Sequence, residues 1–515
     1  MLQVKNLNIV HRKDLRSMLS SFDFVLNKGD KAVIIGEEGN GKSTLLKWIY
    51  DPELVEEYAE ASGERICTGE RLAYLPQELS EEDKRKSVYE FFCEDALIWN
   101  QDPKQLNRMA GELGLPADFF YGERAMGTLS GGEKVKAQIA RIEMMEPTVL
   151  LLDEPSNDID IETLEWLEEW LMNTERAVLY ISHDETLIER TANVVIHMEQ
   201  LRRKTVSRYV VARMPYRTYV QQREAGMNNQ KQQALNERRQ ERIQQEKLRR
   251  IQQKVEHDQN AISRQDPHSG QLLKKKMKAV KSMEHRFERE KEERTQMPET
   301  EEAIMIRFRE DIRIPNGKTV LDFALEELCV PGEGEEEKRV LSEGIALRVK
   351  GSEKVCIIGK NGAGKTTLLR QIARQLLERK DIRAAYMPQN YEERMDLRQT
   401  PVDYLSVTGE KEEITRIRTY LGAMKYTADE MSHAIAELSG GQKAKLFFLK
   451  MILAEANVLI LDEPTRNFSP LSTPVIRKIL SAYGGAVISI SHDRKYISEV
   501  CDTVYELSES GLSKK

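Results

Sequence analysis

Two glycine-rich segments of the sequence carry the residue types that bind phosphate. They read GEEGNGKST at 36–44 and GKNGAGKTT at 359–367, and both match the pattern GxxxxGK[ST]. In such a loop the backbone N–H groups turn inward around a phosphate, the lysine reaches the terminal phosphates and the hydroxyl binds Mg²⁺. The candidate phosphate-binding residues are Gly36, Gly39, Gly41, Lys42, Ser43 and Thr44, and Gly359, Gly362, Gly364, Lys365, Thr366 and Thr367. One match could be a structural glycine turn, but two, each between a strand-like and a helix-like run, predict two nucleotide sites.

An acidic pair follows an apolar, strand-like run in each half of the sequence: Asp153 with Glu154, and Asp462 with Glu463. The carboxyl ends of parallel strands form the sheet edge where ligands bind, so these carboxylates are expected beside the phosphate loops. The aspartate is suited to hold Mg²⁺, usually through water, and the glutamate to orient and deprotonate an attacking water. A surface loop with two acids is the alternative, which the neighbouring motifs disfavour.

A histidine and a glutamine accompany each acidic pair. His183 and His492 follow a further apolar run and could hydrogen-bond a γ-phosphate, although a single histidine is more often a capping or packing residue. Gln77 and Gln389 stand in YLPQ and YMPQ, which is a weak signal because Pro-Gln is common in loops. The two glutamates of the acidic pairs and the two histidines are therefore the candidate catalytic residues.

These motifs recur because the chain repeats itself. LSGGEK at 129–134 returns as LSGGQK at 438–443, and Asp153 and His183 return as Asp462 and His492, each 309 positions later. Short apolar runs flanked by helix-like segments are typical of largely parallel strands between helices. The runs are 31–35, 149–152 and 177–181 in the first copy, and 354–358, 458–461 and 486–490 in the second. The expected fold class is α/β, with a doubly wound sheet in each of two P-loop domains.

Length and composition agree with two or three domains and narrow the class of protein. The 515 residues are 40% hydrophobic and 32% charged, with a formal net charge of −7, which does not mark the whole molecule as a nucleic-acid coat. No run approaches the roughly eighteen apolar residues of a membrane helix. Five scattered cysteines without a CxxC pair indicate neither a disulfide framework nor a zinc site. Because the N-terminus also lacks the features of a signal peptide, a cytoplasmic protein is expected.

The segment between the two copies differs in composition from both. Residues 201–287 hold 22 Lys and Arg against 8 Asp and Glu, so this segment is basic and the remainder of the chain is acidic. Residues 219–260 are rich in glutamine and charge, contain no proline and predict a long solvated helix. Pro267 and Gly270 then interrupt the pattern before helical sequence resumes at 272–294. Two antiparallel helices are therefore expected.

The tip of this helical hairpin is expected near 263–273. A disordered linker is the alternative, against which apolar residues that include Leu235, Ile243 and Ile251 suggest a narrow seam against a partner helix. The expected domains are a first ATPase domain at 1–205, a basic linker at 206–300 and a second ATPase domain at 301–515.

In the order glycine loop, glutamine, LSGG, acidic pair and histidine, the two copies resemble the ATPase domains of the ATP-binding cassette (ABC) superfamily. The resemblance implies two ABC-type P-loop domains that bind ATP and Mg²⁺, hydrolyse ATP and pair head to tail within one monomer. One site would combine Lys42, Ser43, Gln77, Asp153, Glu154 and His183 with Ser439, Gly440 and Gly441. The other would combine Lys365, Thr366, Gln389, Asp462, Glu463 and His492 with Ser130, Gly131 and Gly132. The implied Mg²⁺ ligands are Ser43, Gln77 and Asp153 in one site, and Thr366, Gln389 and Asp462 in the other.

The second copy departs from the family pattern just after its acidic pair. The first copy continues SNDID, close to the family's SNHLD, whereas the second continues TRNFS, with Arg466 and Ser469 where Asn and Asp would stand. Two inequivalent sites are therefore expected. The aromatic residue that stacks on adenine in the family is not evident in this sequence. His11 is the candidate, with an ordinary strand-end residue as the alternative.

Two cassettes, no membrane helix and a basic helical hairpin between them resemble the ABC-F family of ribosome-associated translation factors. The resemblance implies that the linker enters the ribosomal E site and that its tip approaches the peptidyl-transferase centre. The implied partners are the bacterial 70S ribosome, its 23S rRNA and the P-site tRNA. Independently, a positive arm suits RNA phosphates, although a solvated charged helix is the alternative for any single residue. The basic residues available are Arg238, Arg239, Arg249, Arg250, Lys274, Lys275, Lys276 and Lys278.

The cassettes lack added segments, and this points to one subgroup of the ABC-F family. Neither cassette has room for an inserted arm between its glutamine and its LSGG, and the chain ends soon after His492. The lack of added segments, the long tip and the TRNFS segment resemble features of the antibiotic-resistance subgroup. Proteins of that subgroup protect the ribosome from drugs that bind its large subunit. One alternative is a housekeeping ABC-F translation factor. Another, from a different class, is a tandem ATPase subunit of a membrane transporter, which does not require a basic hairpin.

Overall fold

The computed structural model describes residues 1–94, 101–201, 205–261, 308–331 and 338–515, and isolated positions between 275 and 298. The chain forms two compact units. The first, which we call the cassette unit, comprises Met1–Tyr216 and Glu301–Lys515, and the second, the linker unit, comprises Arg217–Thr300. In the described part of the chain, no helix combines the length and apolar character needed to cross a membrane.

A six-stranded sheet forms the centre of the first cassette, in the order β5-β6-β7-β3-β8-β9. All neighbouring strands are parallel except β8 and β9, which are antiparallel. The strands are β3 (Lys31–Ile35), β5 (Leu72–Leu75), β6 (Val149–Asp153), β7 (Ala177–Ile181), β8 (Val194–Leu201) and β9 (Val206–Ala212). Strands β3, β6 and β7 are buried at every position, which explains why their sequences are continuous apolar runs rather than alternating ones.

The second cassette repeats this topology with the order β13-β14-β15-β12-β16-β17. Its strands are β12 (Lys354–Ile358), β13 (Ala384–Met387), β14 (Val458–Asp462), β15 (Ala486–Ile490), β16 (Thr503–Ser508) and β17 (Gly511–Lys514). Only the last pair is antiparallel. The internal repeat and the α/β class predicted from the sequence are therefore confirmed.

Helices follow the strands in both cassettes. Those of the first are α1 (Lys42–Tyr50), α2 (Glu81–Arg85), α3 (Val88–Cys93), α4 (Pro103–Glu112), α5 (Gly131–Met144), α6 (Ile161–Asn173) and α7 (Glu185–Thr191). Those of the second are α10 (Lys365–Leu377), α11 (Pro401–Leu405), α12 (Lys411–Ala423), α13 (Ala428–Ser432), α14 (Gly440–Leu453), α15 (Thr473–Ser481) and α16 (Arg494–Val500). The helices that begin directly after the LSGG serines, α5 and α14, are both capped by that serine.

Antiparallel strands complete each cassette. In the first, β1 (Leu2–His11), β2 (Ser17–Leu26) and β4 (Ala59–Ile66) form a three-stranded sheet. The Phe22 ring of β2 packs edge-on against Tyr209 of β9, with centroids 4.9 Å apart. In the second, β10 (Thr319–Pro331) pairs with β11 (Lys338–Lys350).

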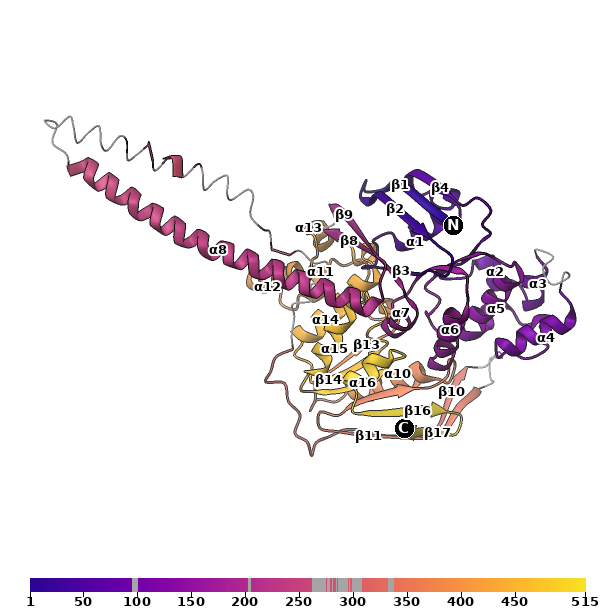
Figure 1. Cartoon of the computed structure of the whole chain (residues 1–515). Coiled ribbons are helices and arrows are strands. Elements are labelled where there is room, and N and C mark those ends of the chain that lie inside the picture. Colours follow the sequence, from indigo (N-terminus) through magenta and orange to yellow (C-terminus); the bar gives the residue numbers. More distant parts are fainter. Residues whose placement is uncertain are drawn as a thin grey trace. The chain divides into compact units, whose positions relative to one another are not determined.

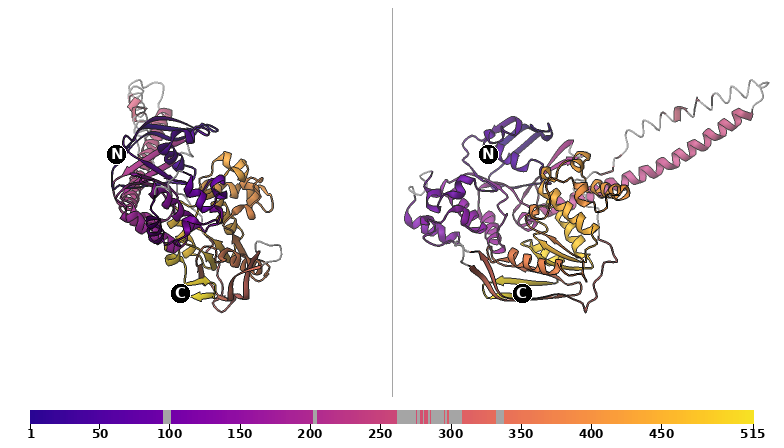
Figure 2. Two further views of the ribbon diagram at one scale, coloured as in Figure 1. Left: turned by 90° about the vertical axis from the view of Figure 1, so that its right-hand side faces the viewer. Right: turned by 180° about the vertical axis from the view of Figure 1, so that it is seen from behind.

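The linker unit contains one long helix, α8 (Tyr216–Ala261), of 46 residues (Figures 1 and 2). Thr295, far along the chain, donates from its backbone N–H and its hydroxyl to the Glu237 carboxylate of α8 at 2.8 and 2.9 Å. The chain therefore returns alongside α8, as a hairpin requires. The described positions 275, 278–279, 281–283 and 285 of the returning run are helical, and the expected tip at 263–273 lies outside the described residues.

Two details of the linker differ from the sequence-based expectation. Residues 206–212, expected in the linker, form β9 and pair with β8 of the first cassette, because an apolar edge is buried better in the sheet than in a solvated arm. The seam of α8 contains Ala234 and half-buried positions at 237, 241, 244 and 248, whereas Leu235, Ile243 and Ile251 are 44–48% exposed. The partner-facing stripe thus follows steps of three and four residues and includes polar side chains.

Candidate nucleotide-binding sites

Each phosphate loop joins a buried strand to a helix whose first turn no side chain caps. Gly41 precedes α1 with φ 86°, and Gly364 precedes α10 with φ 91°. Both angles lie in the left-handed region that glycine adopts without strain. At Gly36 a Cβ would stand 2.2 Å from the Met198 carbonyl oxygen, so the loop entrance also requires glycine. The N–H groups at these helix starts are the expected donors to phosphate.

The two loop lysines fold back over their own loops. Lys42 Nζ donates to the carbonyl oxygens of Gly36 and Glu37 at 2.9 and 3.0 Å. Lys365 Nζ makes the equivalent bonds at 2.7 and 2.9 Å. Burial lowers the pKa of Lys365, which nearby carboxylates oppose. Both ammonium groups therefore stand at the mouth of the loop where terminal phosphates would bind.

Ser43 and Asp153 form a donor set suited to Mg²⁺ in the first cassette. Ser43 Oγ donates to Asp153 Oδ1 at 2.9 Å, and the Tyr74 hydroxyl donates to Asp153 Oδ2 at 3.1 Å. Burial raises the pKa of Asp153 to about 6, although hydrogen bonds from Ser43 and Tyr74 oppose the shift. Burial deprives the Asp153 carboxylate of hydration, and a bound Mg²⁺ would compensate for that loss. Mg²⁺ prefers hard oxygen ligands such as a hydroxyl and a carboxylate.

Glu154 is held by three neighbouring side chains. His183 Nε2 lies 3.1 Å from one carboxylate oxygen, and Gln77 Nε2 and Asn157 Nδ2 donate to the other at 3.2 and 2.6 Å. Burial alone would raise the pKa of Glu154, but the His183 charge and hydrogen bond outweigh it and lower the pKa to about 2. His183 is itself oriented by the second cassette, because its Nδ1 donates to the Phe468 carbonyl at 2.9 Å.

The equivalent glutamate of the second cassette has a different environment. The His492 backbone N–H donates to Glu463 at 3.3 Å, but the His492 ring lies 3.7 Å from the carboxylate. Burial and the Asp462 charge raise the pKa of Glu463 to about 8, and burial and Lys365 lower the pKa of His492 to about 4. Within the described residues, Asp462 Oδ2, Glu463 Oε1 and His492 Nδ1 are buried without a hydrogen-bond partner. Such orphaned atoms fit a site that is completed by Mg²⁺, nucleotide and water.

The second phosphate loop shares a cavity with the signature of the first cassette. The cavity has a volume of about 720 Å³ and is lined by residues from both cassettes. Among them are Ser130, Gly131, Gly362, Gly364, Lys365, Thr366, Thr367, Gln389, Asp462, Glu463 and His492. Gly132 is not part of this lining, and a Cβ there would lie 2.6 Å from Thr163 Oγ1. The structure thus brings the second loop, its acids and the first signature together.

The first phosphate loop lines a smaller cavity of about 400 Å³. Its lining includes Gly39, Gly41, Lys42, Ser43, Thr44, Gln77, Glu154 and His183. Ser439, Gly440 and Gly441 are not in this lining. Instead, the Gly441 N–H is hydrogen-bonded to Glu38 of the first loop. The two sites therefore differ at the signature.

Besides the motif residues, the lining of the smaller cavity includes one expected residue, His11, and others to which the sequence motifs assign no role. His11, the candidate for adenine stacking, is in the lining, with its ring hydrogen-bonded to Asp14 at 2.7 Å, and Tyr58 lies in the same lining. Arg466, which stands where the family's SNHLD pattern has asparagine, lines both cavities and pairs with Asp158 at 2.8 Å. No local signal marks Tyr58, because its place beside the loop depends on the fold of the antiparallel sheet.

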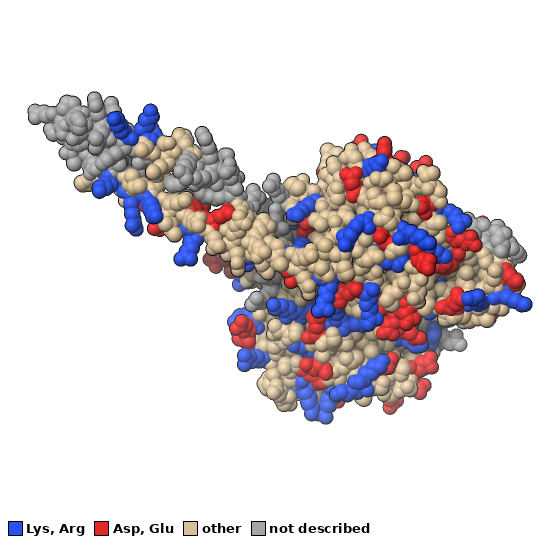
Figure 3. Space-filling model, in the orientation of Figure 1, with Lys and Arg blue, Asp and Glu red and all other residues tan. Residues whose placement is uncertain are grey.

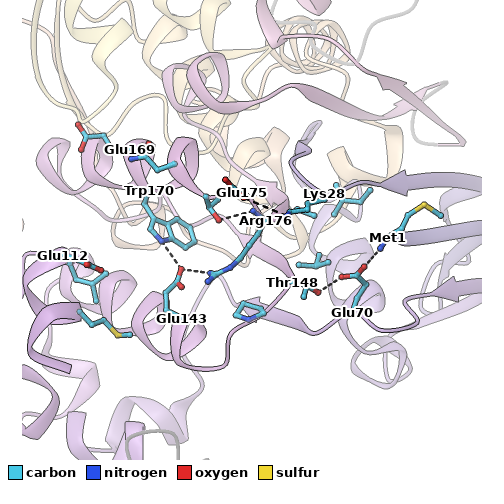
Figure 4. Close-up of a pocket in the computed structure, with 18 of the residues that line it drawn as sticks. Met1, Lys28, Glu70, Glu112, Glu143, Thr148, Glu169, Trp170, Glu175 and Arg176 are labelled. Carbon is cyan, nitrogen blue, oxygen red and sulfur yellow. Dashed lines mark hydrogen bonds and ion pairs between the residues drawn. The ribbon is translucent and has the colours of Figure 1, made fainter. Parts of the chain in front are cut away.

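A further cavity, of about 1020 Å³, lies at the opposite, amino ends of β6 and β7 (Figure 4). Two of its polar groups converge on a third: Trp170 Nε1 and Arg176 both donate to Glu143, at 3.2 and 2.8 Å. None of the candidate residues lines it. This cavity is therefore separate from the nucleotide chemistry.

Comparison with known proteins identifies the family. The family profile described as "ABC transporter" matches residues 19–157 and 342–466. The chain therefore belongs to the ATP-binding cassette family, and it is an ATPase that binds and hydrolyses ATP. Its two cassettes are matched over 96% of the chain by a protein of the ABC-F family.

Three relatives illustrate the range of similar proteins. "ABC transporter F family member 2" of Arabidopsis thaliana is 25% identical over 96% of this chain and 75% of its own length. "Probable ATP-binding protein YheS" of Escherichia coli is 25% identical over 96% and 77%. "Ribosome protection protein VmlR" of Bacillus subtilis is 28% identical over 95% and 84%.

A solved structure shows the same fold. The archaeal ribosome recycling factor aABCE1, in complex with the ribosomal stalk protein aP1, aligns with a TM-score of 0.58 at 16% identity, covering 99% of this chain and 90% of the other. The predicted architecture of two ABC-type P-loop domains separated by a long helical linker is confirmed.

The two catalytic candidates should contribute unequally to turnover. We expect Glu463→Gln to remove the larger share of steady-state ATP hydrolysis, because Glu154 is already tied to His183, Gln77 and Asn157 and its partner signature contacts Glu38. Phosphate release from the two single variants, measured side by side at saturating ATP, checks this. Equal losses would contradict the inequivalence of the sites.

Proposed function

We propose that this ATPase acts on the bacterial 70S ribosome and protects it from antibiotics that bind near the peptidyl-transferase centre. In this proposal ATP closes the two cassettes, the basic linker enters the E site towards the P-site tRNA and 23S rRNA, and hydrolysis releases the protein. The proposal assumes a cytoplasmic monomer with a first ATPase domain that ends near Tyr216, a linker that ends near Thr300 and a second ATPase domain at 301–515. The similarity to the ribosome protection protein VmlR, at 28% identity, supports it.

The observation that carries the proposal is the basic helix α8. Its 46 residues would extend about 70 Å at a rise of about 1.5 Å per residue. The helix holds ten Lys and Arg against six Asp and Glu. Arg238, Arg239, Arg249 and Arg250 are all exposed, and Figure 3 shows basic side chains projecting from it. A positive rod of this length fits a channel lined by RNA phosphates, whereas driving a separate transporter needs no such element.

The geometry above supports the following division of roles in the two proposed composite sites. Lys42 and Lys365 would hold the terminal phosphates, and the signature serines and glycines of the opposite cassette would supply further donors. Mg²⁺ would supply charge neutralisation of the phosphates, held by Ser43, Asp153 and Gln77 in one site and by Thr366, Asp462 and Gln389 in the other. Glu154 and Glu463 would accept the proton of the attacking water, with His183 and His492 beside the γ-phosphate.

Shortening the linker tip tests the proposal. Deletion of 265–270 should abolish drug protection in cells while ATPase activity and ribosome binding persist, because the nucleotide sites and the basic stem are unchanged. The matched comparison is charge reversal at the exposed Lys275 and Lys278 together with Lys274 and Lys276, the last two lying outside the described residues. That variant should instead weaken ribosome sedimentation and make it more sensitive to salt.

Three outcomes separate the candidates. Full protection by the tip-deleted protein would overturn the protection proposal. Ribosome binding without any change of drug susceptibility on expression would favour a housekeeping ABC-F translation factor, as would a growth defect on deletion of the gene. Co-purification with a membrane permease instead of ribosomes would favour the transporter subunit.

A further inference from the structure

The two phosphate loops differ in charge at two positions. After its first glycine the second loop has Lys360 and Asn361, whereas the first loop has Glu37 and Glu38. Carboxylates are unexpected there, because the loop must receive a polyanion and like charges repel. Both glutamates of the first loop contact the second cassette.

Glu37 is buried among three donors of the second cassette. Lys445 Nζ in α14 lies 3.1 Å from one carboxylate oxygen, and the hydroxyls of Ser469, at 2.8 Å, and Ser472 donate to the other. Burial raises the pKa of Glu37, but Lys445 and the two serines outweigh burial and lower it. The carboxylate is therefore ionised and fixes the first loop against the second cassette.

Glu37 also explains why Ser469 replaces the family's aspartate. In the first cassette the equivalent residue, Asp160, faces the second loop and accepts the Asn361 backbone N–H at 3.4 Å. An aspartate at 469 would place a second carboxylate against buried Glu37, whereas a serine hydroxyl donates to it. The irregular TRNFS segment and the acidic first loop are thus one complementary arrangement.

Glu38 reaches the phosphate-binding end of α14. Its carboxylate accepts the Gly441 N–H, and a Cβ on Gly440 would lie 3.1 Å from its Oε2. This N–H belongs to the signature that should complete the Lys42 site. At the equivalent position of the other loop, neutral Asn361 donates to the Asp158 carbonyl at 2.6 Å. Of the two phosphate loops, only the first therefore places a carboxylate on the signature of the opposite cassette.

We propose that Glu38 is a built-in competitor for the γ-phosphate of ATP at the Lys42 site. Its carboxylate occupies the N-terminal donor of α14 until ATP displaces it, and Glu37 anchors the loop that presents it. ADP has no γ-phosphate and does not compete for this donor. Glu38 thus lowers the preference of the Lys42 site for ATP over ADP, which makes it a specificity-determining residue. The inference rests on the composite-site proposal above.

Nucleotide affinity measured at one site at a time tests the inference. In the full chain with the other site disabled by Lys365→Ala, Glu38→Gln should tighten binding of a non-hydrolysable ATP analogue by about tenfold, the usual worth of a hydrogen bond to a charged group. ADP affinity should change much less, because ADP gains only the reduced repulsion and not the freed Gly441 N–H. The reciprocal variant Asn361→Glu, in a Lys42→Ala background, should weaken analogue binding at the Lys365 site more than it weakens ADP binding.

The outcomes are distinguishable. Unchanged analogue affinity in Glu38→Gln, or an equal gain for ADP, would overturn the role of Glu38. Ser439→Ala examines the composite site separately, because the signature serine is expected to contact the same γ-phosphate. If Ser439→Ala weakens analogue binding while Glu38→Gln leaves the analogue affinity unchanged, the composite site is supported and the proposed role of Glu38 is wrong. If neither variant changes the affinity, α14 does not contact ATP and both proposals fall.

Discussion

ATP hydrolysis is expected to fall by at least about a hundredfold when Glu154 and Glu463 are both replaced by glutamine, because a positioned general base contributes roughly that much. ATP binding should persist. Glutamine keeps the shape and hydrogen-bonding reach of Glu154 towards Gln77 and His183, and the lysines of both phosphate loops are unchanged. The variant would therefore close its cassettes on ATP and fail to reopen.

Three measurements together check this expectation. Phosphate release gives the loss of hydrolysis, equilibrium binding of labelled ATP gives retained affinity, and sedimentation with 70S particles in ATP should show the variant trapped on ribosomes. Glu175→Gln is the control, because this glutamate is 90% exposed and outside both sites. Hydrolysis at the original rate would remove both glutamates from the catalytic role. If hydrolysis is lost but the variant is not trapped on ribosomes, both glutamates keep their catalytic role and the ribosome is not the target.

Gly131→Ala should lower hydrolysis by about a hundredfold at the Lys365 site, because a displacement of about 1 Å at a reacting centre can cost that much. A Cβ at Gly131 would lie 1.9 Å from the Asp158 carbonyl oxygen and 3.3 Å from Asn361 Nδ2. The first of these is a backbone atom that a side-chain rotation cannot move. The clash would therefore displace either the first signature or the Asp158 carbonyl oxygen, which accepts the hydrogen bond from Asn361 of the second phosphate loop.

Gly111→Ala provides the matched control, since a Cβ there meets nothing within 4 Å. It lies on α4 of the same cassette, where alanine is a better helix former than glycine. Steady-state hydrolysis should remain unchanged in the control and be lost in Gly131→Ala, with equal circular dichroism for both. Full activity in Gly131→Ala would show that closure at this signature is not needed for hydrolysis.

The repeat, the α/β class and the elements that carry the motifs can all be predicted from the amino-acid sequence. Glycine loops between apolar runs and helix-forming segments marked β3 with α1 and β12 with α10, and the acidic pairs marked the ends of β6 and β14. These features are local, because a loop conformation and a strand end depend on residues adjacent in the chain. The basic linker was equally visible, since net charge is a property of composition.

Contacts between residues that are far apart in the sequence become visible only in the tertiary structure. Glu37 and Lys445 are 408 positions apart, and no periodicity links them. The same holds for His183 with Phe468, and for Tyr58 beside the first phosphate loop. The linker also begins later than the expected 206, because only the pairing of β9 with β8 shows that residues 206–212 belong to the first cassette. The physical reason is that a buried carboxylate or an edge strand takes its role from its partners, and packing alone selects them.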